Sequence, residues 1–285
     1  MREGERKKER SLKNFIKTIN KKIFFYLVRG IYNFFLNFKT PITKILSLFN
    51  LRLSQIYTFL IPIEADKKII KFINISSKFS MTGHTRMYLL SQAILNAKEK
   101  RLEGDFVECG VWRGGNILLY KLLNDFYSLN KTIFAYDTFE GMTTPEDIDI
   151  DFMGNAANKL LIANKKSENL RNVHCFSTID SVKKNILEHT NLKNINFIIG
   201  PVEKTLLIKK NLPKKISVLR LDTDWYSSTK IELEILYPRL VRGGVLIIDD
   251  YGHWQGARKA VDEYFFNKKK CLHVCDYTCR YLIKD

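Results

Sequence analysis

The sequence predicts an α/β fold built on a doubly wound, mostly parallel sheet. Apolar runs rich in Ile, Leu and Val end in carboxylates, as buried parallel strands do when they deliver acids to their C-terminal edge. Amphipathic stretches with a helical period separate these runs, so strand and helix alternate along the chain. The clearest strand-helix-strand unit spans residues 219–250.

Composition indicates a folded protein with an uneven charge. The chain has 285 residues, of which 45% are hydrophobic and 27% charged, as in globular proteins. Residues 1–60 contain thirteen Lys or Arg and three Glu, a net charge of +10, and the other 225 residues carry the remaining +7. The basic character therefore belongs mainly to the N-terminal arm.

Residues 1–79 are expected to form a basic amphipathic helical extension. Large apolar residues alternate with Lys and Arg, a pattern typical of helices that lie on an anionic membrane surface. A helical cap on the folded domain or a dimer partner is the alternative. The aliphatic content exceeds what a phosphate-binding tail needs, so we expect no nucleic-acid partner. No apolar run approaches the ~20 residues of a membrane span.

The cysteines and the N-terminus bear on localisation. Five cysteines are scattered without a framework spacing, which favours a reducing cytoplasm. The charged start lacks the form of a signal peptide. We expect a cytoplasmic protein that attaches peripherally to the inner face of the cell membrane through residues 1–60.

The folded domain is expected to begin at residue 80, with a helix over residues 80–98. A short strand then ends in Glu108, and a glycine turn follows with Gly110, Gly114 and Gly115. Glycines let the backbone approach a ligand closely, and the following helix N-terminus can hold an anionic group. The spacing matches neither a Walker A nor a dinucleotide fingerprint, so this turn alone is a weak signal.

A second strand, Lys131–Asp137, also ends in an acid. Asp137 lies 29 residues after Glu108, one strand-helix-strand unit further on. In open α/β nucleoside sites the acid at this place accepts from the two ribose hydroxyls. The acidic segment 138–154 is expected to be a loop over the site.

Further elements are expected at Val173–Phe176 (extended), Thr178–His189 (a helix capped by Ser177), Ile195–Gly200 (a strand), Arg258–Phe266 (a helix), and Leu272–Asp276 and Arg280–Ile283 (two strands, with an antiparallel one at the end).

The central unit brings three acids together. One strand ends at Asp222 and the other at Asp249 and Asp250, with a helix over 228–240 that Gly243 and Gly244 would stop. Three clustered carboxylates repel one another, and a hard cation such as Mg²⁺ keeps them ionised at one place. The alternative is that these acids only cap helices and turns.

Taken together, the motifs resemble those of the macrocin O-methyltransferase (TylF/MycF-type) family. The resemblance covers roughly residues 80–285 and leaves residues 1–79 outside. It is carried by Phe106–Gly115, Asp137-Thr-Phe-Glu-Gly141, Leu219-Arg-Leu-Asp-Thr-Asp224, Tyr226, Ser228-Thr229, Tyr237-Pro238, Gly243-Gly244 and Asp249-Asp-Tyr251. It implies a Rossmann-like class I methyltransferase domain that uses S-adenosylmethionine and Mg²⁺ to methylate a hydroxyl of a sugar or glycosylated small molecule, and we expect a homo-oligomer.

The resemblance also implies roles for single residues. It places Glu108, Gly110 and Gly115 in the S-adenosylmethionine pocket, Asp137 on the ribose, Ser177, Gly200 and Val202 beside the adenosine, and Asp222, Asp249 and Asp250 on the metal. The histidine base that some members carry after the second strand is absent from Met142–Met153. Asp222 and His253 are therefore the candidate bases for the acceptor hydroxyl.

Two other functions compete with this one. Asp222-Thr-Asp224 has the Asp-x-Asp form of a metal-dependent glycosyltransferase, but Glu108, the glycine turn and Asp137 favour an adenosyl site. A membrane-associated scaffold with a degenerate methyltransferase fold is the non-enzymatic alternative. The presence of the ribose acid and all three metal acids argues against it.

Overall fold

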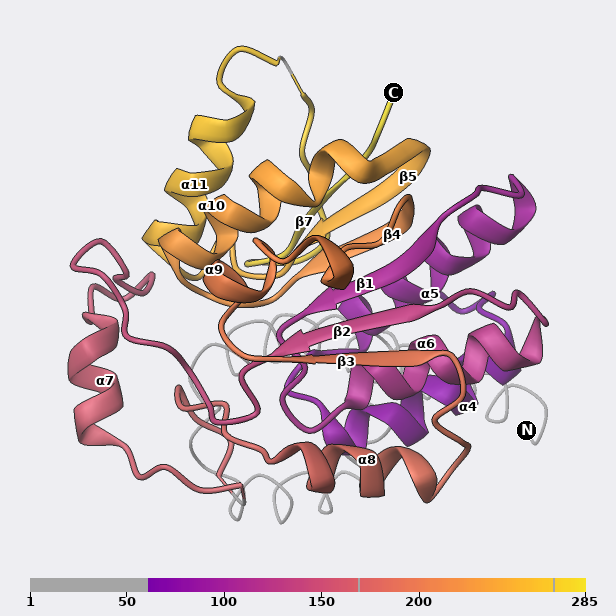
Figure 1. The fold of residues 1–285 in the computed structure, drawn as a ribbon, viewed down its shortest axis with the longest axis horizontal. Coiled ribbons are helices and arrows are strands. Elements are labelled where there is room, and N and C mark those ends of the chain that lie inside the picture. Colours follow the sequence, from indigo (N-terminus) through magenta and orange to yellow (C-terminus); the bar gives the residue numbers. More distant parts are fainter. Residues whose placement is uncertain (1–60, 169, 269) are drawn as a thin grey trace, which may run out of the picture. The chain divides into compact units, whose positions relative to one another are not determined.

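The computed structural model in Figure 1 describes residues 61–168, 170–268 and 270–285. The chain divides into two compact units, Met1–Phe59 and Leu60–Asp285. The second unit holds every element described below. The expected membrane contact of residues 1–60 lies outside the described residues and stays a prediction.

One mixed sheet of seven strands forms the centre of the second unit, in the order β3-β2-β1-β4-β5-β7-β6. Strands β1 to β5 pair in parallel, and β7 pairs antiparallel with both β5 and β6. The predicted doubly wound sheet with an antiparallel strand at the end is thereby confirmed. The strands are β1 Asp105–Cys109, β2 Ile133–Asp137, β3 Ile195–Ile199, β4 Ile216–Leu221, β5 Leu240–Ile248, β6 His273–Val274 and β7 Arg280–Ile283.

Each face of the sheet carries its own apolar core, because alternate residues of a strand point to opposite faces. Phe106 and Val218 belong to one core, while Val107 and Leu219 belong to the other. The first core is covered by α4 Lys67–Ser76, α5 His84–Glu99, α6 Gly115–Phe126 and α8 Ile179–Leu187. The second is covered by α9 Val202–Thr205, α10 Tyr226–Ile235 and α11 Gln255–Phe265, and Figure 1 shows these two groups on opposite sides of the strands.

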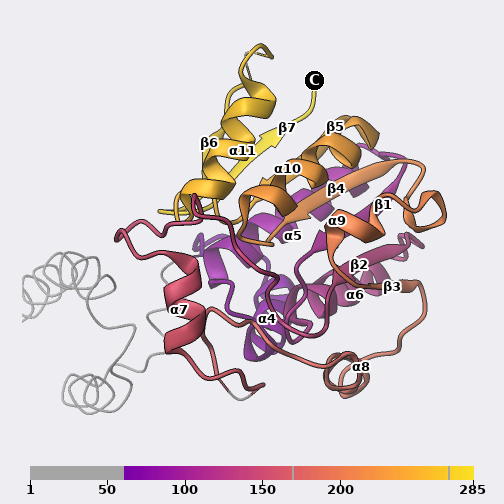
Figure 2. The same cartoon turned by 60° about the vertical axis from the view of Figure 1, so that its left-hand side comes forward.

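Helix α7, Ala157–Ala163, stands away from the sheet, as the turned view in Figure 2 shows. Only Ala157 of this helix is buried, and it packs with Trp225 and Trp254 in a third, small cluster. Short 3-10 turns complete the described elements at Ser77–Phe79, Lys209–Asn211 and Tyr237–Arg239.

The boundary of the folded domain differs from the expected one. Helix α4 lies before residue 80, yet Ile69, Phe72 and Ile73 are part of the first core together with α5 and α6. The chain therefore divides between Phe59 and Leu60, not between Phe79 and Ser80. This helix contains basic residues, as the arm does, so the sequence pattern did not distinguish it from the arm.

The helix of the central unit is shorter than expected. It ends at Ile235 because Pro238 follows, and proline has no N–H to donate and disfavours a helical conformation in the residue before it. Gly243 and Gly244 do not stop this helix but lie inside β5. The register with β4 is irregular there, since Ile216 pairs with Leu240 and Val218 with Val245.

Two local predictions on the way to α8 were wrong. Val173–Phe176 forms turns and not a strand, and Cys175 has a φ of 44°. The N-cap of α8 is Thr178, whose side chain accepts from Ser181 N at 3.3 Å, and not Ser177.

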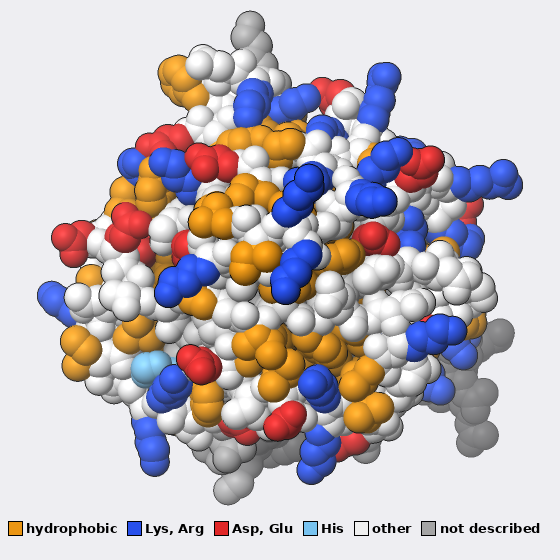
Figure 3. Space-filling view, in the orientation of Figure 1, with side chains coloured by type: hydrophobic (Ala, Val, Ile, Leu, Met, Phe, Trp, Pro, Cys, Tyr) orange, Lys and Arg blue, Asp and Glu red, His pale blue; other side chains and the backbone are white. Residues whose placement is uncertain are grey.

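The surface of the described residues mixes basic and apolar side chains. Figure 3 shows Lys and Arg side chains scattered over one face, with apolar side chains between them. No helix among the described residues is both long and apolar enough to cross a bilayer. All five cysteines are free thiols, and Cys109 and Cys279 are buried.

Candidate functional site

The glycine turn after β1 touches the end of β4. Asp222 N donates to Cys109 O at 2.9 Å, and a Cβ on Gly110 would lie 1.9 Å from Asp222 O. Gly110 also has a φ of 87°, which only glycine adopts freely. The two most informative stretches of the sequence therefore meet at one edge of the sheet.

Asp137 fastens this turn from the end of β2. Its Oδ2 accepts from Val111 N at 2.6 Å and Trp112 N at 3.0 Å, and its Oδ1 accepts from Phe139 N at 2.7 Å. Burial raises the pKa of this carboxyl, while the backbone donors act in the opposite direction. Asp137 is thus already bonded to backbone at both oxygens, so any contact with ribose would be an additional one.

The structure separates the other expected cofactor residues. Gly200 lies beside Asp137, since Gly200 N donates to Asp137 O at 2.9 Å. Gly115 and Val202 pack against other parts of the domain, and their expected roles in cofactor binding stay predictions. A Cβ on Gly115 would lie 2.6 Å from Ser80 Cβ, and Val202 is 5% exposed in the second core. The sequence could not distinguish a glycine that admits a ligand from one that admits a neighbouring segment.

Two buried polar atoms, one in the turn and one shortly before α8, lack a hydrogen-bond partner among the described residues. They are Trp112 Nε1 and Ser177 Oγ. Helix α8, which begins two residues after Ser177, contacts the turn through Asn185 Nδ2, which donates to Arg113 O at 3.0 Å. Buried polar atoms without partners are rare in proteins, and a polar ligand is one way to satisfy them.

Glu108 belongs to a buried charge network. Arg220 on β4 is buried, and its guanidinium pairs with Glu108, with Asp249 and, at 2.8 Å, with Asp222 Oδ2. Arg86 on α5 pairs with Asp249 from the other side. Burial raises the pKa of Glu108 to about 7, although Arg220 and Asn116 act in the opposite direction. Glu108 Oε2 has no partner among the described residues and remains available to a donor.

Asp249 pairs with two arginines of this network and is not among the acids that lie together. Burial acts to raise the pKa of Asp249, but Arg220 and Arg86 outweigh burial and lower it. Both of its oxygens are taken by guanidinium groups. The expected role of Asp249 as a metal ligand therefore disagrees with the geometry.

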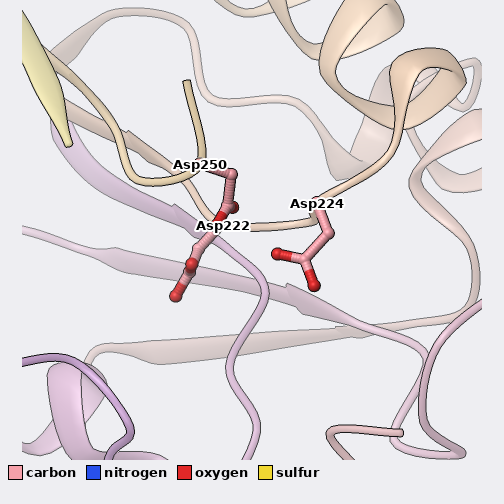
Figure 4. A group of neighbouring side chains, drawn as sticks. All are labelled: Asp222, Asp224 and Asp250. Atoms are coloured by element: carbon pink, nitrogen blue, oxygen red, sulfur yellow. The ribbon is translucent and has the colours of Figure 1, made fainter. Parts of the chain in front are cut away.

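Asp224 takes the place that we expected for Asp249. Figure 4 shows Asp222, Asp224 and Asp250, and one oxygen from each lies within 4.8 Å of the others. Burial raises the pKa of Asp224 to about 6, and burial with mutual repulsion raises those of Asp222 and Asp250 well above the ordinary value. Three oxygen donors that repel one another fit a hard divalent cation. The Asp-x-Asp triplet, which the sequence analysis links to a glycosyltransferase, is the sequence signal for Asp224.

Two residues that the sequence analysis missed hold this acidic segment in place. Asp224 has a φ of 67°, so the backbone between β4 and α10 needs support. Glu232 Oε1 accepts from Thr223 Oγ1 at 2.9 Å, and Asp149 Oδ1 accepts from Tyr226 N at 2.9 Å. The loop containing Asp149 is therefore fastened to the start of α10.

His253 follows Asp250 on the same loop. His253 N donates to Asp250 O at 3.0 Å, and its ring Nδ1 lies 3.3 Å from Tyr277 Oη. Burial lowers the pKa of this ring. The ring makes an edge contact with Phe152, and its role as a base stays a prediction.

With this geometry in view, comparison with known proteins identifies the family. The family model described as "Macrocin-O-methyltransferase (TylF)" matches residues 74–284. The chain belongs to the macrocin O-methyltransferase family. The match begins at residue 74, near the C-terminal end of α4.

Individual members of the macrocin O-methyltransferase family are similar over most of this domain. Demethyldecarbamoylnovobiocin O-methyltransferase of Streptomyces niveus is 30% identical over 188 residues, which are 65% of this chain and 67% of the relative. An O-methyltransferase of Streptomyces olivaceus, named for the 4' position of 8-demethyl-8-(2,3-dimethoxy-alpha-L-rhamnosyl)-tetracenomycin-C, is 30% identical over 204 residues, or 70% of this chain and 73% of the relative. The solved structure of the O-methyltransferase NovP superimposes with a TM-score of 0.61 at 28% identity, covering 72% of this chain and 82% of that one.

Proposed function

We propose that this protein transfers a methyl group from S-adenosylmethionine to a hydroxyl of a sugar in a glycosylated small molecule. The observation that carries the proposal is the contact between the glycine turn and the acidic cluster, where Asp222 N donates to Cys109 O. A donor held at the turn and an acceptor held at Asp222, Asp224 and Asp250 would lie side by side. Relatives whose names specify glycosylated acceptors support the substrate class.

The donor side of the proposed site consists of the turn and its polar surroundings. Asp137 fixes the backbone of the turn, and Glu108 Oε2, Ser177 Oγ and Trp112 Nε1 offer unpartnered polar atoms. An acceptor at Glu108 suits the ammonium group of a methionine moiety, because a buried carboxylate oxygen gains from a cationic donor. Gly200, which donates to Asp137 O, would flank the adenosine.

On the acceptor side, Asp222, Asp224 and Asp250 would hold Mg²⁺. When bound, this ion would orient vicinal hydroxyls and acidify the reacting one. Asp224 is a further candidate proton acceptor, because it belongs to the acidic cluster beside which the hydroxyl would lie. Asp222 is a weaker candidate, since Arg220 donates to its Oδ2. His253 remains a second candidate from the neighbouring loop.

The proposed activity is tested by following the methyl group. Enzyme is incubated with methyl-labelled S-adenosylmethionine, 4-nitrophenyl α-L-rhamnopyranoside and Mg²⁺, and the glycoside is analysed by mass spectrometry. We expect one added methyl group on the sugar and loss of turnover in EDTA that Mg²⁺ restores. Related glycosides form the rest of the panel.

Two outcomes would contradict the proposal. Transfer of a glycosyl group from a nucleotide sugar, with no transfer from S-adenosylmethionine, would show that the Asp-x-Asp triplet belongs to a glycosyltransferase. Calorimetric titration that finds no binding of S-adenosylmethionine would favour the scaffold. Full activity in EDTA would contradict the proposed role of Mg²⁺ but not the proposed methyl transfer.

A further inference from the structure

An aromatic cluster lies beside the acidic site, and two of its three rings, Phe152 and Tyr277, have no part in the proposed chemistry. Phe152, His253 and Tyr277 form it: the Phe152 ring centroid lies 5.1 Å from that of His253 and 5.8 Å from that of Tyr277. Phe152 is 57% exposed and Tyr277 is 46% exposed. Exposed apolar groups that gather at one place mark binding surfaces more often than single ones do.

The topology of the sheet places this cluster at the edge that carries the acids. Strand β7 runs antiparallel to β5 with Arg280 opposite Ile248, so the turn before β7 lies where β5 ends. Gly252 N donates to Thr278 O at 2.8 Å, and a Cβ on Gly252 would lie 2.2 Å from Tyr277 O. Tyr277 is therefore held close to the loop that follows Asp250.

Phe152 is held in place although its ring is exposed. Asp151 is 6% exposed, and its Oδ1 accepts from Met153 N at 2.9 Å and Asn155 N at 2.8 Å. Gln255 N donates to Ile150 O at 2.9 Å, which ties the loop to the start of α11. A ring presented on a fixed backbone binds a ligand with less loss of conformational entropy than a free one.

We propose that Phe152, His253 and Tyr277 form a platform that binds the aglycone of the acceptor, a flat apolar or aromatic group attached to the sugar that is methylated. Asp250 lies next to the platform, since both His253 N and Trp254 N donate to Asp250 O at 3.0 Å. A sugar placed at the acids would carry its aglycone towards these rings. The inference rests on the proposed function, because that function supplies the position of the sugar.

The size of the cluster favours a small ligand over a protein. One aromatic side chain buries about 150–250 Å² at most, so three rings match a single ring system. A stable interface with a second copy of the chain needs about 800 Å² on each side. The rings prefer edge-to-face or offset contact with another aromatic group, which gives the platform a preference for aromatic aglycones.

Two glycosides that differ only in the aglycone test the platform. The dissociation constants of 4-nitrophenyl and methyl α-L-rhamnopyranoside are measured on the full chain by calorimetry, with S-adenosylhomocysteine and Mg²⁺ present. We expect the nitrophenyl glycoside to bind more tightly. Phe152→Ala and Tyr277→Ala should each weaken its binding by about threefold or more, as expected for the loss of an aromatic contact, and leave the methyl glycoside within about twofold.

Phe266→Ala is the matched control, because Phe266 is 83% exposed and follows the far end of α11. It should change neither constant. Tyr277→Phe keeps the ring and should retain the preference. Failure of the nitrophenyl glycoside to bind, equal binding of the two glycosides, or a preference that survives Phe152→Ala and Tyr277→Ala together would overturn the platform. A change in sedimentation of the Phe152→Ala protein from dimer to monomer would also overturn it and assign the rings to an interface.

These results separate the two proposals. Methyl transfer to both glycosides without an aglycone preference would reject the platform and keep the methyltransferase. An aglycone preference without any methyl transfer would keep the platform and reject the reaction.

Discussion

The neighbouring residues Asp249 and Asp250 have opposite surroundings. Asp249 accepts from two arginines in the interior, whereas Asp250 joins Asp222 and Asp224 at the edge of the sheet. Both acids follow β5, which ends at Ile248, and their side chains reach different partners. The two acids should therefore respond differently to the same substitution.

Asp250→Asn tests the metal role at the edge. We expect loss of Mg²⁺-dependent turnover with little change in the binding of S-adenosylmethionine, because removal of one charged ligand weakens a hard-cation site far more than a separate donor site. Asp224→Asn should behave in the same way. Calorimetry with Mg²⁺ and with S-adenosylmethionine measures the two effects separately, and full activity of either variant would contradict the metal role.

Asp249→Asn tests the buried network. Loss of this carboxylate leaves Arg220 and Arg86 without a buried partner, and breaking a buried ion pair destabilises a protein by about 3–5 kcal/mol. We expect a lower melting temperature, measured by calorimetry, for this variant than for Asp250→Asn. Equal melting temperatures for the two variants would argue that the arginine contacts contribute little to folding.

Asp137→Ala tests the donor side of the site. The change removes an acceptor for ribose and also the acceptor of Val111 N and Trp112 N. We expect the dissociation constant of S-adenosylmethionine to rise by about tenfold or more, as when charge-assisted hydrogen bonds are lost. Asp137→Asn, which keeps one carbonyl oxygen, should bind more tightly than the alanine variant. An unchanged constant in both would move the ribose contact elsewhere.

At the scale of single elements, α4 decides where the catalytic domain begins. Ile73 is fully buried in the first core, and Ile63, ten residues earlier, is fully exposed. Ile73→Ala should lower the free energy of unfolding by about 2–5 kcal/mol, as is usual for a large-to-small change in a core. Ile63→Ala should change it by about 0.5 kcal/mol or less. Urea unfolding of both variants measures the difference, and equal values would place α4 outside the domain.

The whole molecule joins a methyltransferase domain to a basic arm. Residues 1–60 carry a net charge of +10, and each Lys or Arg near an anionic membrane contributes about 1 kcal/mol of attraction. We expect the full chain to sediment with phosphatidylglycerol vesicles at low salt and less so at high salt. A protein that starts at Ile61 should stay in solution.

The same pair of proteins distinguishes membrane attachment from a cap. If residues 1–60 cap the domain, their removal should lower the melting temperature and leave vesicle binding unchanged. Negligible sedimentation of both proteins at low salt would reject the membrane role.

Local sequence patterns predicted the sheet and the acidic character of its edge. Apolar runs rich in Ile, Leu and Val, each ending in an acid, predicted buried parallel strands whose ends meet, and this holds for Glu108, Asp137 and Asp222. The signal is local, because the apolar residues of a buried strand are consecutive in the chain. Short motifs such as Asp222-Thr-Asp224 likewise belong to one segment.

Long-range contacts of the fold set which acids face one another. Asp249 pairs with Arg220 on β4 and with Arg86 on α5. Asp224, and not Asp249, lies together with Asp222 and Asp250. Gly115 and Val202 serve packing because residues 76–80 and the second core happen to lie against them. The platform of Phe152, His253 and Tyr277 comes from three separate segments. Such contacts join residues far apart in the chain, and no local pattern records them.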